Sequence, residues 1–301
     1  MVRFAAMLCL LLIDPVRAVH AQVPSAEATP LGIVKLRQNL FLVTGGSPNI
    51  GGSAITVVFV RSTDVVVIDT KGPRPWWGEA IADEVKRLTK LPITTIINTS
   101  SAGDHVAGNI ALVNSRIAII AHERAAADMR KMTLMFTKPT GGGLPTRTFK
   151  DRLTLGSGPD RVELYYFGAG HCDSDIFVMI PEVRVLLTGD AFGGKFLPAL
   201  GRNNGGDGVE YPNTLTKALP LTRDIDVIIT GHGGGLAKPQ DLEVHRDFMR
   251  DFLESTRQAR KAGQTAAAAA KAWQMPARYV GYEAQPDRVL GAMEWIYRQL
   301  R

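Results

Sequence analysis

The sequence predicts a domain of the α/β class, and three observations support this prediction. The chain has 301 residues, of which 45% are hydrophobic and 21% charged; these proportions are typical of a globular protein and exclude a disordered or fibrous one. Short apolar runs such as Asp64–Asp69 and Ile93–Asn98 indicate buried strands. A helical pattern that opens at Pro73 and Pro75 separates these two runs, and alternation of strands with helices is typical of α/β domains.

The first 21 residues are predicted to be a secretory signal peptide rather than part of the fold. Arg3 precedes an apolar run over Phe4–Ile13, and small residues occur near the cleavage side in Val19–Ala21. Asp14 shortens the apolar run, so an uncleaved anchor is the alternative, but the run is well below the length that spans a bilayer. We therefore expect one mature domain over residues 22–301, periplasmic or secreted, with no membrane attachment after cleavage.

Cysteine usage and charge narrow the function classes. Cys9 leaves with the signal peptide, so Cys172 is the one cysteine of the mature chain and no internal disulfide can form.

The net charge is +6, yet no five basic residues stand in a row. A solvated basic surface is therefore favoured over a nucleic-acid interface, and attraction for anionic substrates is left open. The sequence does not indicate an oligomeric state.

In the first half of the chain, four runs rich in β-branched and apolar residues are predicted strands. They are Asn39–Thr44, Ala54–Val60, Asp64–Asp69 and Ile93–Asn98. The Gly-rich turn Gly45–Gly52 separates the first two. A helix follows the third, because Ile81, Val85 and Leu88 recur at spacings of four and three.

In the second half, the Gly/Pro/Thr-rich segment Thr137–Thr148 is predicted to be a long loop, either near an active-site mouth or a mobile connection. The strands expected after it are Val162–Phe167, Ile176–Ile180, Val183–Thr188 and Val227–Thr230. The expected helices are Asp241–Ala262, Thr265–Trp273 and Val289–Leu300. The Ala266–Ala270 run favours helix rather than disorder.

Polar groups follow directly after four of the predicted strands. These groups are Ser100–His105, Gly170–Asp173, Gly189–Asp190 and Gly231–Gly233. Open sheets present their sites at the carboxyl ends of strands, and the neighbouring glycines let the backbone turn sharply. Zinc accepts both imidazole nitrogen and carboxylate oxygen. A lone Asp beside Gly is more often a turn residue, but repetition at four strand ends favours a metal site.

These residues resemble the motifs of the metallo-β-lactamase superfamily. The usual first motif, Thr-His-x-His-x-Asp-His followed by Gly-Asn, stands here as Thr99–His105 with Gly108–Asn109 after it. His171 occupies the position of the family's Gly-His-Thr element, and Asp190 and His232 match its bridging Asp and its last ligand. The resemblance covers nearly the whole mature chain. It implies an αββα sandwich, in which two mixed sheets lie face to face between helices and carry metals at one edge.

The sequence departs from the family at the first metal position. Two histidines of the usual motif are replaced by Ser100 and Ala102, neither of which is a normal zinc ligand, so His171 alone is left there, helped at most by Asp190. The ligands that the resemblance assigns to the second metal position are all present in this sequence: Asp104, His105 and His232, with Asp190 as a fourth. We therefore expect one zinc in the second position and an empty or weak first position, with a second zinc left open.

Three further residues are candidates for lining the site. Ser100 either donates a hydrogen bond to a bound oxyanion or water, or caps a turn. Cys172 follows His171 and could replace a ligand, but adjacent residues tend to point apart, which favours a buried thiol. Lys195 follows Gly193–Gly194 and could face an anionic substrate.

Two function hypotheses follow from these residues and the resemblance. The first is an exported zinc-dependent hydrolase that cleaves an ester, thioester, lactone or β-lactam bond of a small molecule, with Asp104 both as ligand and as the residue that orients the reacting groups. The second is a non-catalytic relative that uses the pocket for binding. The five surviving ligand-type residues favour the hydrolase, and the sequence does not name its substrate.

Overall fold

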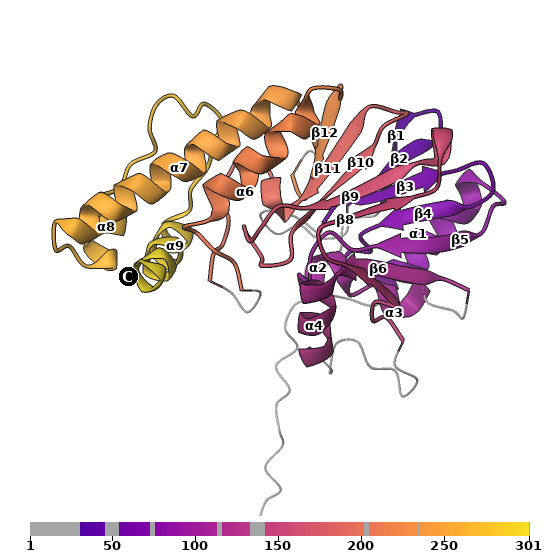
Figure 1. Cartoon of the computed structure of the whole chain (residues 1–301), viewed down its shortest axis with the longest axis horizontal. Helices are drawn as coiled ribbons and strands as arrows, with labels where there is room; N and C mark the ends of the chain where they lie inside the picture. Colours follow the sequence, from indigo (N-terminus) through magenta and orange to yellow (C-terminus); the bar gives the residue numbers. More distant parts are fainter. Residues whose placement is uncertain are drawn as a thin grey trace, which may run out of the picture.

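The computed structural model describes residues 31–45, 54–72, 76–112, 116–132, 142–201, 205–233 and 235–300 (Figure 1). The predicted signal peptide, most of the turn Gly45–Gly52 and the first part of the predicted loop Thr137–Thr148 lie outside the described residues. Within the described ranges, no helix is both long and apolar enough to cross a membrane.

The first sheet has seven strands in chain order, β1 to β7. The pairs from β1 to β4 are antiparallel, and those from β4 to β7 are parallel. Its strands are β1 (Gly32–Arg37), β2 (Leu40–Thr44), β3 (Thr56–Val60), β4 (Val65–Ile68), β5 (Ile93–Ile97), β6 (Ala118–His122) and β7 (Arg147–Phe149). Because β4, β5 and β6 run parallel, their carboxyl ends lie at the same edge of the sheet.

The second sheet has six strands in the order β13-β12-β11-β10-β9-β8. The pair β11–β12 is parallel and the other pairs are antiparallel, so this sheet is also mixed. Its strands are β8 (Arg152–Leu155), β9 (Val162–Tyr166), β10 (Ile176–Ile180), β11 (Val185–Gly189), β12 (Val227–Thr230) and β13 (Leu236–Ala237).

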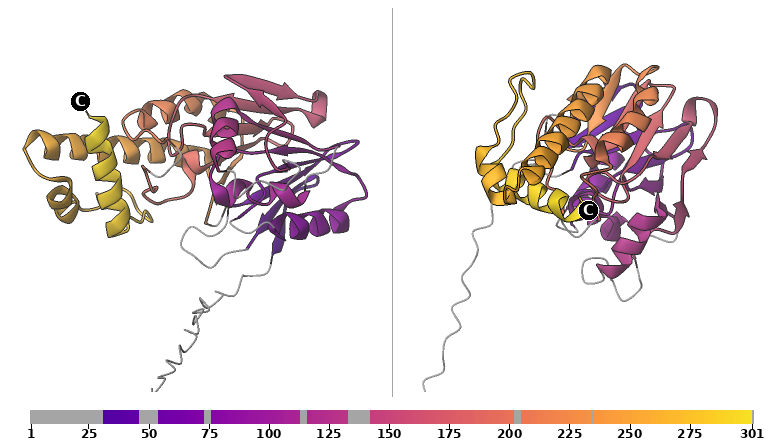
Figure 2. Two further views of the ribbon diagram at one scale, coloured as in Figure 1. Left: turned by 90° about the horizontal axis from the view of Figure 1, so that it is seen from below. Right: turned by 60° about the vertical axis from the view of Figure 1, so that its left-hand side comes forward.

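Helices cover the outer face of each sheet. Helices α1 (Trp76–Leu88) and α3 (Asn109–Leu112) pack on the outer face of the first sheet. Helices α2 (Gly103–Val106) and α4 (Glu123–Lys131) follow β5 and β6 and bury apolar residues in a small cluster of their own. The second sheet carries α6 (Tyr211–Ala218), α7 (Pro239–Lys261), α8 (Ala266–Ala272) and α9 (Pro286–Gln299). Seen from below, the C-terminal helices form one end of the molecule and the first sheet with α1 forms the other (Figure 2, left).

The core has three apolar layers, because strands of both sheets bury both of their faces. Val57 and Phe59 of β3 pack between the sheets, whereas Val58 packs with Ile81 of α1. On β10, Val178 likewise belongs to the layer between the sheets, while its neighbours face the layer under α6 to α9. Alternate residues of a strand point to opposite faces, so strands covered on both sides become continuous apolar runs. The predicted αββα sandwich is confirmed.

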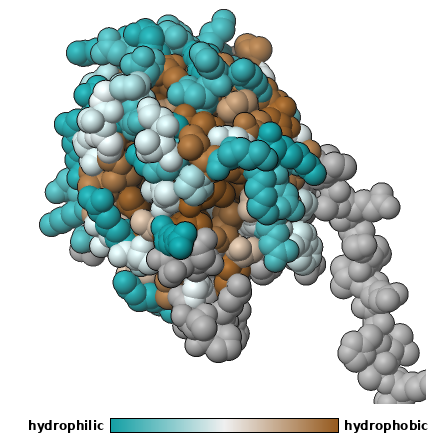
Figure 3. All heavy atoms as spheres, turned by 90° about the vertical axis from the view of Figure 1, so that its right-hand side faces the viewer, coloured by the Kyte–Doolittle hydropathy of each residue, from teal (hydrophilic) through white to brown (hydrophobic). Residues whose placement is uncertain are grey.

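Few large apolar side chains of the described residues reach the solvent. A space-filling view of the side that lies on the right in Figure 1 shows apolar atoms framed by polar and charged ones (Figure 3). The exposed large hydrophobic residues are Val34, Trp76, Leu236, Val244 and Val280. Single exposed apolar residues of this kind are normal for a protein surface.

The structure corrects the predicted element list in two respects. The end of the predicted loop Thr137–Thr148 belongs to strand β7, which starts at Arg147 and pairs with β6. Several elements were not predicted at all, namely β1, β6, β8, β13, α2, α3, α4 and α6. The remaining predicted strands and helices agree with the structure to within a few residues at each end.

Candidate metal centre

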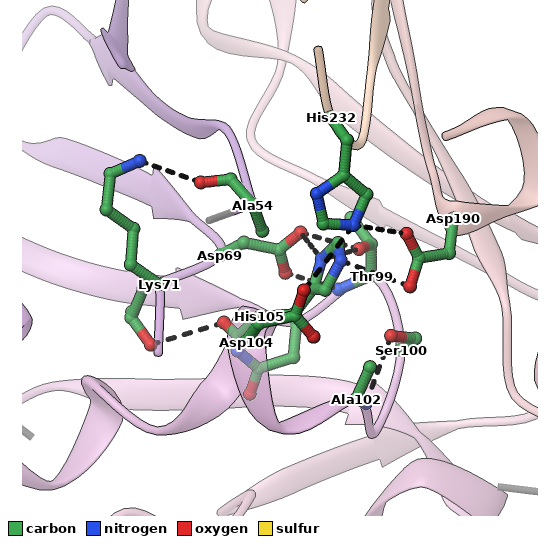
Figure 4. Close-up of polar contacts among 12 residues, drawn as sticks. Ala54, Asp69, Lys71, Thr99, Ser100, Ala102, Asp104, His105, Asp190 and His232 are labelled. Atoms are coloured by element: carbon green, nitrogen blue, oxygen red, sulfur yellow. Dashed lines mark hydrogen bonds and ion pairs between the residues drawn. The ribbon is translucent and has the colours of Figure 1, made fainter. Parts of the chain in front are cut away.

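Loops that follow strands of both sheets meet at one edge of the sandwich (Figure 4). Asp69 follows β4, and Thr99–His105 follow β5. From the second sheet come Asp190, directly after β11, and His232, two residues after β12. His171 lies in the turn between β9 and β10. All five predicted ligand-type residues therefore lie at this edge.

Asp69 contacts the ring nitrogen of His105 that faces away from the other candidate ligands. Asp69 Oδ2 lies 2.6 Å from His105 Nδ1, and the carboxylate also accepts hydrogen bonds from the Thr99 amide at 2.8 Å and the Thr99 hydroxyl at 2.6 Å. Asp69 has a positive φ of 57°, a conformation that Asp tolerates better than most residues. With Nδ1–H donated to this carboxylate, His105 turns Nε2 toward the site.

A glycine allows the Asp69 loop to pack against α2. The Thr70 amide donates to the His105 carbonyl at 2.7 Å, and the Gly108 amide donates to the Lys71 carbonyl at 3.2 Å. A Cβ on Gly108 would lie 2.0 Å from the Thr70 carbonyl oxygen, which no side chain can occupy. The Gly-Asn pair after the first motif thus has a structural reason: Asn109 Oδ1 accepts from the Thr70 hydroxyl at 2.8 Å.

Asp190 lies at the centre of the polar cluster. Its Oδ1 is 2.9 Å from His232 Nε2, and its Oδ2 is 3.2 Å from His105 Nε2 and 3.4 Å from His171 Nδ1. Asp104 Oδ2 approaches the same His232 nitrogen at 3.4 Å. One carboxylate therefore faces imidazoles of both family metal positions.

The residues of the second position fit a zinc ion. One ligand atom each from Asp104, His105 and His232 lies within 4.8 Å of the other two. His105 Nε2 is buried, lies 3.2 Å from Asp190 Oδ2 and makes no hydrogen bond of normal geometry within the described part of the chain, so this nitrogen and the Asp190 carboxylate are placed to bind the same metal. Two imidazole nitrogens and a carboxylate oxygen are a usual zinc donor set, and Asp190 can supply a fourth.

The carboxylates and imidazoles of the cluster shift one another's pKa. Burial opposes the charged form of His105, but Asp190 and Asp69 outweigh it and raise the pKa well above its ordinary value. His232 follows the same pattern, with burial opposed by Asp190, and its pKa is raised. Burial would raise the pKa of Asp190, yet His105, His171 and His232 hold it well below its ordinary value. For His171, burial prevails and lowers the pKa.

The family assignment rests on most of the chain. Residues 50–232 match the family model for the metallo-beta-lactamase superfamily. The chain belongs to the metallo-β-lactamase superfamily. It is a metal-dependent hydrolase of that superfamily, and the predicted resemblance is confirmed.

Relatives and solved structures agree with this assignment. The "Metallo-beta-lactamase type 2" of Bacteroides fragilis is 24% identical over 180 residues, which are 59% of this chain and 68% of the relative. The crystal structure of the DIM-1 metallo-beta-lactamase covers 75% of this chain and 99% of its own, with a TM-score of 0.62 and 19% identity. The stereoselective inverting sec-alkylsulfatase Pisa1 from Pseudomonas sp. covers 90% of this chain and 50% of its own, with a TM-score of 0.71 and 16% identity.

The superfamily's first metal position is altered in the structure as in the sequence. Ser100 is buried, and its Oγ accepts a hydrogen bond from the Ala102 amide at 3.2 Å. Of the two roles considered for Ser100, turn capping is the one its contacts show. Ala102 is buried too and provides no side-chain ligand atom, so this side of the position has lost both imidazoles.

Cys172 is a buried thiol, as predicted, but the expectation that its side chain points away from His171 is wrong. Cys172 Sγ lies 3.3 Å from His171 Nδ1 in the turn that contains both residues. The Gly170 amide donates to the Cys172 carbonyl at 2.8 Å, and the Cys172 amide donates to Asp175 Oδ2 at 2.8 Å. Asp175 thus organises the turn. Burial raises the pKa of Asp175 to about 8.

Two lysines need comment, one predicted and one not. Lys195 Nζ lies 3.0 Å from Asp241 Oδ1 on α7, so its charge is already compensated, and its contact with a substrate stays a prediction. Lys71 was missed. It is fully buried with a positive φ of 63°, and its Nζ reaches away from the cluster to the Gly45 and Ala54 carbonyls at 3.1 and 2.7 Å (Figure 4). Burial lowers the pKa of Lys71 to about 7.

Proposed function

We propose that this chain is an exported zinc-dependent hydrolase that cleaves an ester, thioester, lactone or β-lactam bond in a small molecule. Asp104, His105 and His232 would hold the zinc, with Asp190 as a fourth ligand. The orientation of His105 carries this proposal. Its Nδ1 lies 2.6 Å from Asp69 Oδ2, while its buried Nε2 faces Asp190 Oδ2 at 3.2 Å and makes no hydrogen bond of normal geometry in the described structure.

A bound zinc would supply hydroxide near neutral pH, since it lowers the pKa of a coordinated water to about 7. The protein itself would hold the atoms that bind the zinc in their positions. Asp69 keeps His105 in one tautomer and one orientation, which is the usual role of a carboxylate behind a metal-binding histidine. Asp190 faces His105, His171 and His232 at once, so it holds the three rings around one centre.

Of the three proposed zinc ligands, Asp104 is the most exposed to solvent. Its side chain is 37% exposed, against 10% for His232 and 0% for His105. A substrate therefore approaches over Asp104, and this carboxylate can accept or hold a proton at the open side of the centre. The other donors are shielded, which keeps their geometry independent of the substrate.

The names of the relatives guide the choice of substrates. Two structural neighbours are named as a metallo-beta-lactamase and a sec-alkylsulfatase, so a first panel of substrates would hold β-lactams and sulfate esters besides carboxylic esters, thioesters and lactones.

The proposal of export rests on the signal-peptide pattern of residues 1–21. Cleavage after Ala21 is checked by N-terminal sequencing of protein recovered from the cell envelope or medium.

The test compares His105→Ala and His232→Ala with His122→Gln. His122 is also buried, but its Nε2 contacts the Lys150 carbonyl at 2.8 Å, so it controls for loss of an imidazole elsewhere. We expect both site variants to lose at least about 100-fold in kcat/KM, since even outer partners of metal sites typically contribute 10–100-fold. Unchanged hydrolysis in the site variants would contradict a catalytic zinc held by His105 and His232. No hydrolysis in any folded zinc-loaded protein would leave the non-catalytic binding protein as the better account.

A further inference from the structure

We infer that the chain holds a second zinc in a site built from His171, Cys172 and Asp175. This inference rests on the proposed function, because it adds a metal beside the zinc of Asp104, His105 and His232. One ligand atom from each of the three residues lies within 4.8 Å of the other two. Nitrogen, thiolate sulfur and carboxylate oxygen are all zinc donors.

The spacing of the first two donors suits a zinc ion. A tetrahedral zinc with Zn–S of about 2.3 Å and Zn–N of about 2.0 Å separates sulfur and nitrogen by about 3.5 Å. Cys172 Sγ and His171 Nδ1 are 3.3 Å apart. The two donors therefore need almost no movement to share a metal, although they are neighbours in the chain.

Asp175 provides a second observation, independent of the sulfur–nitrogen spacing, that points to a ligand bound by these three residues. The residue is 1% exposed, and its Oδ1 finds no hydrogen-bond partner among the described residues. Its Oδ2 meanwhile holds the Cys172 amide. A buried carboxyl oxygen without a partner is unfavourable, and a cation at this point would satisfy it.

The site compensates for the altered first position. Ser100 and Ala102 bring no ligand atom toward His171, so a metal there must take donors from elsewhere. Cys172 and Asp175 come from the same turn as His171. Asp190 Oδ2 lies 3.4 Å from His171 Nδ1 and 3.2 Å from His105 Nε2, so this carboxylate contacts a proposed ligand of each zinc site.

A different role for the thiol is excluded by its burial. A nucleophilic cysteine paired with histidine must reach the bound substrate. Cys172 is 0% exposed, so its sulfur can contact an ion that enters the turn but not a substrate bond. The neighbouring His171 side chain is 18% exposed, so one donor of the proposed site is accessible from solvent.

Cobalt(II) loading tests the site without any substrate. The full chain carries Cys9→Ser, so that Cys172 is its one thiol, and is stripped with a chelator and titrated with Co²⁺. We expect two equivalents of cobalt and a near-ultraviolet sulfur-to-cobalt charge-transfer band. Cys172→Ser should lose the band and one equivalent, whereas His232→Ala should lose one equivalent and keep the band. Asp175→Asn should weaken the cobalt that gives the band at least about 10-fold.

Ser174→Ala is the matched control. Ser174 is buried in the same turn and its Oγ also lacks a partner in the described structure, but it is not one of the three donors, so band and stoichiometry should stay unchanged. Absence of the band in the Cys9→Ser chain, which needs no further variant to be folded, overturns the site. A band that persists in a protein without hydrolytic activity supports the site and contradicts the proposed function instead.

Discussion

Asp69 Oδ2 lies 2.6 Å from His105 Nδ1, and both side chains are buried. This contact fixes which nitrogen of His105 faces the metal centre. Asp69→Asn removes the charge but keeps the size, and we expect zinc to bind 10–100-fold more weakly, as is typical when the outer partner of a metal ligand is lost. Competition with a chromophoric chelator measures the zinc affinity.

Asp64→Asn is the control for that variant. Asp64 precedes β4 as Asp69 follows it, and it binds Arg61 and the Thr94 hydroxyl at 2.6 Å each. Its variant should lower the free energy of unfolding and leave zinc affinity unchanged. Equal zinc affinities in Asp69→Asn and the wild type would refute the orienting role of Asp69.

Gly108→Ala should destabilise the fold by about 2 kcal/mol or more, because its Cβ would lie 2.0 Å from the Thr70 carbonyl oxygen and force the backbone apart. Gly291→Ala is the matched change: no atom lies within 4 Å of the new Cβ, and within α9 the substitution should stabilise by about 0.5–1 kcal/mol. Urea unfolding of both variants gives the comparison, and equal stabilities would contradict the tight packing of the Asp69 loop on α2.

The stability contributed by Lys71 should depend on pH. Burial lowers its pKa in the folded protein to about 7, from 10.5 ordinarily, so between these values the unfolded chain binds more protons than the folded one. Stability from this group therefore rises with pH through that window. The difference in unfolding free energy between wild type and Lys71→Met should rise by a few kcal/mol from pH 6 to pH 10. A difference that is flat or falls over that range would show that Lys71 is not a buried, near-neutral amine.

Restoring the family's histidines should rebuild the usual first position without sulfur. In a Cys172→Ser background, Ser100→His with Ala102→His places two imidazoles on the loop after β5. We expect the second cobalt equivalent to return without the sulfur charge-transfer band. Because both positions are buried, overpacking should cost about 1–3 kcal/mol of stability. If the variant is folded but binds no additional metal, the backbone of that position has diverged from the family.

The central strands were predictable, with the exception of β6, and the edge strands were not. In β3 and β4 nearly every residue is buried, which produces the apolar runs seen in the sequence. The edge strand β8 is partly or fully exposed along its length, and helices α2 and α3 have four residues each, too few for a helical period to show.

The candidate ligands were predictable from their positions after strands, but some of their contacts were not. The sequence indicated that Asp175 organises this turn, and its bond to the Cys172 amide confirms that, but the sequence does not indicate that the bend brings Cys172 Sγ to His171 Nδ1. The burial of Lys71 depends on a left-handed residue between strand and helix, a conformation that the sequence does not indicate for lysine.

The most direct test of the central claim is the zinc content of the full chain and of His232→Ala, measured by elemental analysis after purification without chelators and addition of zinc. His232 Nε2 faces both Asp190 and Asp104, so the account predicts that the variant holds one zinc per chain fewer than the wild type. The same zinc content in both proteins, or no zinc in the wild type, would contradict a zinc centre built on Asp104, His105 and His232.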